Sequence, residues 1–192
     1  MTNRLPRLPL LLLTALLAAL TLAACGGHKQ PTHHGEGEGA YIEAGPLIYQ
    51  VQMSRQLEPS NVEDREYLEG LPAGEPPLAG DELWFGVWLR VQNATGESHV
   101  SASDFTIVDT VGNEYEPVEL PESNPFSYQS VSLEGEDGQP VYPNPESAAG
   151  TGPIQGSLLL FRLNTSAFAN RPIELEIEPP EGGEPSTVVL DV

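Results

Sequence analysis

Cys25 is the residue with the most distinctive chemistry in this sequence, because it is the one cysteine among 192 residues. A deprotonated thiol is a strong nucleophile that accepts acyl or alkyl groups. With no second cysteine in the chain, Cys25 has no partner for an internal disulfide. We therefore expect Cys25 to be a site of covalent modification, and we expect the rest of the chain to fold without disulfides.

Residues 1–24 have the pattern of a secretory signal peptide. Arg4 and Arg7 form a short positive start, an apolar run extends from Leu8 to Leu22, and small residues follow. This order of segments is typical of export signals. The run is too short for a stable membrane-spanning helix, which needs about 20 apolar residues.

The end of this leader, Leu22-Ala23-Ala24-Cys25, resembles the lipobox of bacterial lipoproteins. The resemblance implies that the Cys25 sulfur is lipidated, that the leader is cut just before it, and that the new N-terminus is acylated. Two or more acyl chains anchor a protein stably to a bilayer. The sequence thus predicts a lipid anchor on the extracytoplasmic face of the cell membrane; the alternative is an ordinary signal peptide with an incidental cysteine.

Three carboxylates near the C-terminus have the spacing of one strand face. Glu174, Glu176 and Glu178 alternate with apolar residues, so they project from the same side of an extended chain. Carboxylates at this spacing are candidate ligands for calcium. No EF-hand-like loop accompanies them, so a solvated strand face that discourages edge-to-edge pairing is the competing interpretation.

His33 and His34 are weak candidates for zinc, because they lie in a segment rich in Gly and Glu that we expect to be a flexible tether over residues 25–45. Ser98 and His99 are adjacent in a loop, but no acid with a recognisable motif completes a triad. The G-x-S-x-G, H-E-x-x-H and phosphate-loop motifs are also absent from the sequence. We therefore expect no catalysis and no cofactor, with divalent-metal binding as the alternative function.

The charge balance excludes one class of partner. The chain has 28 acidic and 8 basic residues, a formal net charge of −20. Nucleic-acid binding requires clustered Lys and Arg, so it is not expected. The acidic surface serves solubility or a cationic partner.

Residues 46–192 are expected to form one all-β domain, an immunoglobulin-like β-sandwich of about seven strands. The predicted strands cover residues 47–53, 82–93, 104–109, 114–118, 157–163, 173–178 and 187–192. One short helix is predicted from a capping box at Ser60 and Glu63, ending at Gly70 or Pro72.

The strand from Glu82 to Asn93 has apolar residues on both faces, including Trp84 and Trp88. It is either a central strand covered on both sides or an exposed aromatic platform for a ligand. A tryptophan contributes a large apolar area in either setting.

Three stretches resemble a family of secreted bacterial domains of unknown function with a telokin-like, immunoglobulin-like fold. They are FGVWLRVQNATGE from Phe85, SASDFTIVDTVGNEYEP from Ser101, and GTGPIQGSLLLFRLN from Gly150. The resemblance implies the fold and an extracytoplasmic location, and it carries no catalytic residues. The inserted segment around residues 59–72 departs from the family pattern, and we expect it to cover one end of the sandwich.

Together these features predict a lipid-anchored, non-enzymatic binding module of unknown partner. Its contact surfaces are expected in two loop regions rich in Pro and Asn, residues 58–77 and 121–149.

Overall fold

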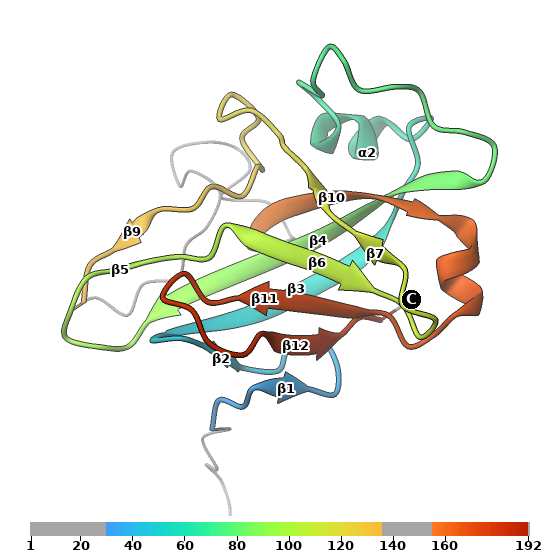
Figure 1. Cartoon of the computed structure of the whole chain (residues 1–192). Helices are drawn as coiled ribbons and strands as arrows, with labels where there is room; N and C mark the ends of the chain where they lie inside the picture. The colour runs from blue at the N-terminus through green and yellow to red at the C-terminus, as the bar shows by residue number, and fades with distance from the viewer. Residues whose placement is uncertain (1–29, 136–154, 192) are drawn as a thin grey trace, which may run out of the picture. The chain divides into compact units, whose positions relative to one another are not determined.

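The computed structural model describes residues 30–135 and 155–191, which contain two five-stranded sheets (Figure 1). Sheet A has the order β2-β3-β4-β10-β8. Its strands are β2 (Ile42–Ala44), β3 (Leu47–Leu57), β4 (Glu82–Asn93), β8 (Pro117–Val118) and β10 (Ser157–Asn164). Sheet B has the order β1-β12-β11-β6-β7. Its strands are β1 (His34–Gly35), β6 (Asp104–Val108), β7 (Glu114–Tyr115), β11 (Glu174–Glu178) and β12 (Ser186–Val189).

The remaining elements are short. Strands β5 (His99–Val100) and β9 (Ser132–Leu133) form a two-stranded sheet, α2 (Val62–Tyr67) is an α-helix, and η2 (Thr165–Ala169) is a 3-10 turn. The predicted β-sandwich with one short helix is confirmed. The strand number differs, since the described residues hold twelve strands, of which five are only two residues long.

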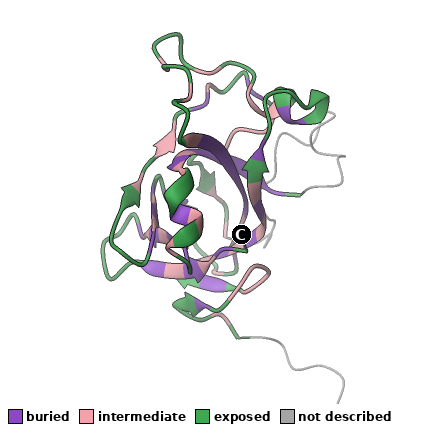
Figure 2. Cartoon of the chain, turned by 90° about the vertical axis from the view of Figure 1, so that its right-hand side faces the viewer, coloured by how far each residue is buried: buried purple, intermediate pink, exposed green. Residues whose placement is uncertain are grey.

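The main core fills the space between the sheets, where buried strand residues face one another (Figure 2). In β6, Phe105 and Ile107 are buried while Asp104, Thr106 and Val108 are not. Strand β11 alternates in the same way. This period of two is what a strand with one core face requires, and it explains why the sequence pattern located these strands.

Strand β4 differs because it is buried on both faces. Its inward residues join the main core, whereas Trp84 and Trp88 belong to a second cluster on the outer side of sheet A. That cluster contains Leu57, Trp84, Trp88, Leu120, Leu158 and Leu160, with Met53, Tyr67, Leu68, Leu71, Leu78, Val118 and Phe126 packed against it. The central-strand interpretation is therefore correct, and the alternative of an exposed aromatic platform is excluded.

Residues 58–81, which we call the cover segment, supply four of the side chains that seal this outer face. Figure 1 shows α2 lying over the face of sheet A rather than beyond its strand ends. The expectation that this insertion covers one end of the sandwich is thus corrected. The physical reason is that a strand apolar on both sides needs a cover on each.

Charged contacts fasten the cover segment to sheet A. Arg55 donates to Asp64 at 2.5 Å, and the second oxygen of Asp64 accepts from the Glu58 amide at 2.8 Å. The hydrogen bond from Arg55 lowers the pKa of Asp64, which is almost fully buried. The Arg55 guanidinium also lies 5.5 Å from the Trp88 ring centroid, and Tyr67 meets Trp88 edge to face at 5.1 Å.

The helix begins one residue later than predicted. Asn61, not Ser60, is the N-cap, and its side chain accepts from the Glu63 amide at 2.9 Å. The helix ends at Tyr67, before the predicted Gly70 or Pro72. Asn is as good a cap as Ser, so sequence alone does not choose between adjacent candidates.

The folded part begins earlier than the sequence suggested. The compact unit starts at Pro31, and strands β1 and β2 lie within residues 31–45 of the predicted tether. Strand β1 pairs with β12, and Ile42 of β2 is fully buried. Ile42 supplies an apolar contact to the core that the Gly- and Glu-rich composition of the segment did not indicate. Residues 25–29 lie outside the described residues.

We predict that Asp64→Ala loosens the cover segment and lowers the free energy of unfolding by about 1–3 kcal/mol, because Arg55 and the Glu58 amide lose their acceptor. Urea titration followed by tryptophan fluorescence measures the free energy of unfolding. A red shift of the tryptophan emission reports greater exposure of Trp88 to water. The matched control is Glu66→Ala, an exposed residue of the same helix. Equal stability of the two variants would contradict the role given to Asp64.

Candidate functional site

A groove of about 480 Å³ opens in the side of the sandwich where the chain passes from one sheet to the other. Strand β7 pairs with β6 in sheet B, and β8 pairs with β10 in sheet A, with Glu116 alone between them. The chain therefore leaves sheet B at this point. We call the opening the inter-sheet groove; it is lined by Ser103, Phe105, Leu158, Leu159, residues 117–122 and residues 128–130.

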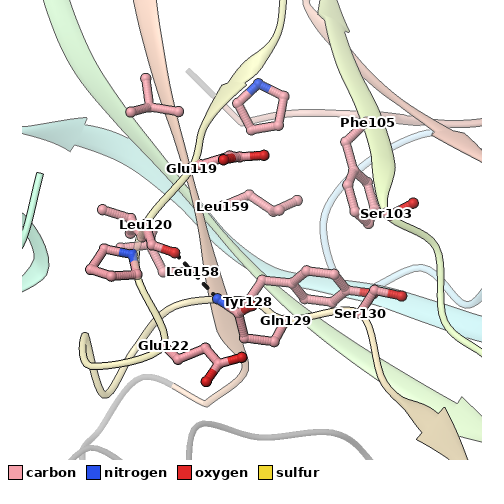
Figure 3. Close-up of a pocket in the computed structure, with 13 residues that line it drawn as sticks. Ser103, Phe105, Glu119, Leu120, Glu122, Tyr128, Gln129, Ser130, Leu158 and Leu159 are labelled. Atoms are coloured by element: carbon pink, nitrogen blue, oxygen red, sulfur yellow. Dashed lines mark hydrogen bonds between the residues drawn. The ribbon is translucent and has the colours of Figure 1, made fainter. Parts of the chain in front are cut away.

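The groove has an apolar floor and a polar rim. Phe105 and Tyr128 meet edge to face at 5.1 Å, and Leu159 lies beside them. Figure 3 shows Ser103 and Phe105 on one side of the opening and Leu120 and Glu122 on the other. Ser103, Glu119, Glu122 and Ser130 are exposed. A concave surface that combines apolar side chains with polar groups able to orient a ligand is a candidate binding site.

Two tyrosines fix the backbone at the entrance to β6. The Ala102 amide donates to the Tyr49 hydroxyl at 2.7 Å, and the Tyr128 hydroxyl donates to the Ala102 carbonyl at 2.8 Å. Burial raises the pKa of Tyr49 to about 12 and also raises the pKa of Tyr128. Both phenols are therefore neutral at ordinary pH, and they position Ser103 and Phe105.

The opposite wall, residues 119–130, is tied to both sheet A and the cover segment. Asn124 is buried and donates to the carbonyls of Tyr67 and Glu69 at 3.1 and 2.8 Å. Further along, the Tyr128 amide donates to the Leu158 carbonyl at 2.9 Å. Gln129 also donates to the Leu120 carbonyl at 3.3 Å, which closes the loop on itself (Figure 3). The wall is thus held in place before any ligand arrives.

The polar side chains of the groove lining are hydroxyls, carboxylates and one amide. It contains no His, Cys, Lys or Arg. The Ser130 hydroxyl donates to the Ser101 carbonyl, and no base is bonded to Ser103. A nucleophile activated for catalysis needs a neighbouring base, and neither Glu119 nor Glu122, the two carboxylates of the lining, is hydrogen-bonded to Ser103 or Ser130.

The predicted acidic face lies elsewhere, on the outer side of sheet B. Glu174, Glu176 and Glu178 follow one face of β11, as expected. Strand β11 lies between β12 and β6, so its carboxylates do not protect a sheet edge as the sequence suggested. Among residues 30–135 and 155–191, no group of three or more His, Cys, Asp or Glu side chains is placed to hold a metal ion.

His34 lies in strand β1, and His33 directly precedes it. His34 Nδ1 lies 2.7 Å from Thr187 Oγ1, and His33 Nδ1 lies 2.9 Å from the Glu43 carbonyl oxygen. The expectation that they sit in a flexible tether is therefore wrong. Their ring nitrogens are used to join β1 to neighbouring strands, and the metal-binding alternative gains no support here.

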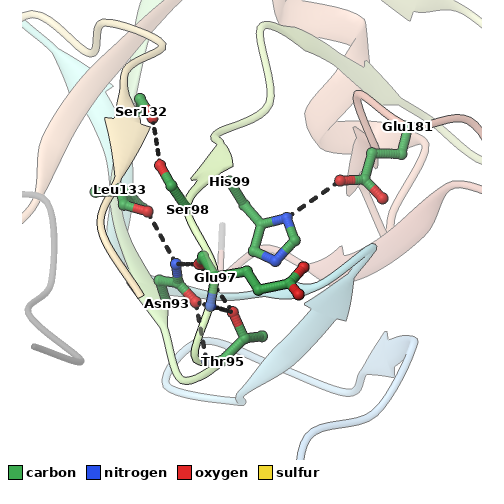
Figure 4. A network of polar contacts seen from close by, with 8 residues as sticks. All are labelled: Asn93, Thr95, Glu97, Ser98, His99, Ser132, Leu133 and Glu181. Atoms are coloured by element: carbon green, nitrogen blue, oxygen red, sulfur yellow. Dashed lines mark hydrogen bonds and ion pairs between the residues drawn. The ribbon is translucent and has the colours of Figure 1, made fainter. Parts of the chain in front are cut away.

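Asn93 and His99 belong to a polar network at the other end of sheet A (Figure 4). The Asn93 amide donates to the carbonyls of Glu97 and Leu133 at 2.7 and 2.9 Å. His99 Nδ1 lies 3.2 Å from Glu181 Oε1, an orienting acid that the sequence did not reveal. Ser98 is bonded to Ser132, however, so no described hydroxyl completes a triad with His99.

The lipobox and Cys25 lie outside the described residues, as does most of the acidic loop from Glu134 to Gly138. Of the two predicted contact regions, residues 58–77 largely cover sheet A, while residues 121–130 form part of the groove. The sequence missed Ser103, Phe105 and Leu159 as groove residues. No sequence signal marks them, because the groove arises from the sheet change at Glu116.

No family model matches the chain, and no curated protein matches its sequence. The yjhA protein of Bacillus subtilis aligns with a TM-score of 0.52 at 13% identity, over 81% of this chain and 99% of its own. This likeness shows a shared fold.

Two further solved structures give lower scores. A B. subtilis protein described as a candidate lipoprotein (ycdA) gives a TM-score of 0.48 at 15% identity, covering 79% of this chain. An uncharacterised β-sandwich protein of Clostridium difficile 630 gives 0.43 at 10% identity, covering 86% of this chain and 99% of its own. This chain spans 38% of the length of the ycdA protein.

Asp109 closes the turn that leads into β7, so it supports the strand arrangement beside the groove. Its carboxylate accepts from the Val111 and Asn113 amides at 3.1 and 2.9 Å and from the Asn170 side chain at 2.9 Å. Gly112 takes a φ of 83° in this turn, a left-handed conformation that favours glycine. Burial raises the pKa of Asp109, but hydrogen bonds from Asn170, Asn113 and Val111 outweigh it and hold the pKa at about 2.

We predict that Asp109 stabilises the fold above pH 4 and that this contribution disappears as the pH falls from about 4 to 2. The folded-state pKa lies below the unfolded value of about 3.9, so protonation favours unfolding. Thermal melts of the wild type and of Asp109→Asn between pH 2 and 7 test this. The difference in Tm should be largest at neutral pH and shrink towards pH 2. A difference in Tm that stays constant across this pH range would contradict the prediction. Glu184→Gln, at an exposed site, is the control.

Proposed function

We propose that this chain is an extracytoplasmic lipoprotein, anchored through Cys25, whose sandwich binds a partner in the inter-sheet groove and catalyses no reaction. The observation that carries the proposal is the groove itself, a hollow of about 480 Å³ in the side of the sandwich with both apolar and polar side chains in its lining. Binding residues are commonly presented by loops on such scaffolds. The immunoglobulin-like, telokin-like family suggested by the sequence fits this role.

The anchor is supported by the leader and by Leu22-Ala23-Ala24-Cys25. In the part of the chain that the structure describes, no helix is long and apolar enough to span a membrane. A lipidated Cys25 would be followed by only a few residues before the folded unit at Pro31.

The binding role is supported by the way the groove is built. Tyr49 and Tyr128 fix one wall through Ala102, and Asn124 fixes the other through the cover segment. A preformed site loses little conformational entropy when its partner binds. Neither wall presents a nucleophile with a base, so the arrangement favours recognition over catalysis.

We predict that Cys25→Ser releases the protein from the membrane fraction or leaves it unprocessed, because a serine hydroxyl cannot accept the diacylglyceryl group as the thiolate does. Cell fractionation with immunoblotting measures the distribution, and metabolic labelling with a fatty acid measures lipidation. The fold should be unaffected, since Cys25 precedes the compact unit. Unchanged membrane association and processing would contradict the anchor.

We predict that Ser103→Trp abolishes capture of partner proteins from solubilised cell envelopes, because an indole at this exposed position fills the groove. Ser60→Trp, an equal substitution at an exposed residue outside the groove, should leave capture unchanged. Pull-down with the full chain in neutral detergent, compared by mass spectrometry, provides the measurement. Equal capture by wild type and both variants would show that the groove is not the binding site.

A further inference from the structure

We propose that the occupant of the inter-sheet groove is an extended cationic peptide segment of a partner protein, which adds as a strand to the free edge of β6. This inference depends on the binding function proposed above for the groove. It goes further by naming the backbone edge that the partner pairs with and the side-chain pattern that it must carry.

The edge of β6 is only partly used. Strand β11 pairs with all five residues of β6, from Asp104 to Val108, whereas β7 pairs only with Ile107 and Val108. After Tyr115 the chain moves to sheet A. Among the residues that the structure describes, no strand lies beside Ser103 to Thr106 on the groove side, and Ser103 and Phe105 line the groove there.

The hydrogen-bond pattern shows which backbone groups face the groove. The Asp109 amide donates to the Asn113 carbonyl, so Asp109 directs its backbone groups away from β11. The backbone N–H and C=O groups of successive residues point to alternate sides of a strand. Those of Ile107, Phe105 and Ser103 therefore also point away from β11. No described residue bonds to the outward N–H or C=O of Phe105 or Ser103. An unpaired edge of this kind is a template for β-strand addition.

The side chains of β6 define the pattern of the added strand. Phe105 points into the core, while Asp104 and Thr106 point to the outer face of sheet B. Side chains of paired strands alternate in the same manner. Residues of the partner that lie beside Phe105 therefore meet the apolar floor at Tyr128 and Leu159, and their neighbours lie beside Asp104.

The outer positions favour Lys or Arg in the partner. Asp104 is opposite Glu178 in the β6–β11 pairing, and Glu176 is the next outward residue of β11. Neither Asp104, Glu176 nor Glu178 forms an ion pair with a described residue. Burial raises the pKa of Glu176, and the charges of Glu178, Glu114 and Glu174 raise it further. Like charges facing each other destabilise a sheet, so a partner cation relieves this repulsion.

Three labelled peptides test the inference by fluorescence anisotropy with the full chain in neutral detergent. The first alternates, Lys-Val-Lys-Val-Lys-Val-Lys. The second has the same composition in blocks, Lys-Lys-Val-Val-Val-Lys-Lys, and the third replaces every Lys of the alternating peptide by Glu. We expect the alternating cationic peptide to bind about tenfold tighter than the block peptide, the acidic peptide not to bind, and affinity to fall with added salt.

Variants locate the peptide. Asp104→Asn and Glu178→Gln should each weaken binding of the alternating peptide about threefold, as expected for exposed charge pairs. Glu66→Gln, an exposed carboxylate of helix α2 in the segment that covers the outer face of sheet A, should not weaken it. Ser103→Trp should abolish binding. Circular dichroism of each variant confirms that it is folded.

The outcomes separate this inference from the proposed function. Equal binding of the alternating and block peptides would show general attraction to an acidic surface, and it would overturn strand addition. If no peptide binds while Ser103→Trp still abolishes capture of envelope proteins, the groove functions but its occupant has another chemistry. If Ser103→Trp affects neither experiment, the proposed function itself fails.

Discussion

Strand β4 has apolar side chains on both of its faces, and this constraint determines what the surrounding chain must do. One face joins the core between the sheets, and the other carries Trp84 and Trp88. Leaving two tryptophans in water would forgo several kcal/mol of burial. The cover segment removes them from water, the Arg55–Asp64 pair fastens it, and Asn124 extends that support to the groove wall. The groove therefore has its shape because β4 needs a second cover.

The regular strands were predictable because each is either an alternating apolar and polar run or a nearly continuous apolar run. The bounds of β4 match the predicted range, and β6, β10 and β11 lie within one residue of theirs. The first strands were not predictable. Residues 31–45 have few apolar side chains. Strand β1 in this range pairs with β12, which is distant in sequence, and β2 pairs with β3. Tertiary pairing overrides local propensity in such segments.

The candidate site was less predictable than the fold for a related reason. Sequence indicated that residues 121–149 form a contact region, and part of that range does line the groove. It did not indicate that Ser103 and Phe105 lie opposite, because this depends on the change of sheet at Glu116. The acidic face of β11 was visible from the spacing of its glutamates. Its position in the middle of sheet B could not be read, since strand order is not a local property.

A β-sandwich has to manage the edges of both its sheets, and this chain does so by keeping most edge strands short. Strands β1, β7 and β8 have two residues each, and β2 has three. Moving from β7 to β8 through a single residue lets one segment protect an edge of each sheet. The β6 edge is only partly covered in this way, since the two paired residues of β7 do not span the five of β6. The short β7 therefore leaves Ser103 and Phe105 without a neighbouring strand on the groove side among the described residues, and Asp104 lies within that stretch.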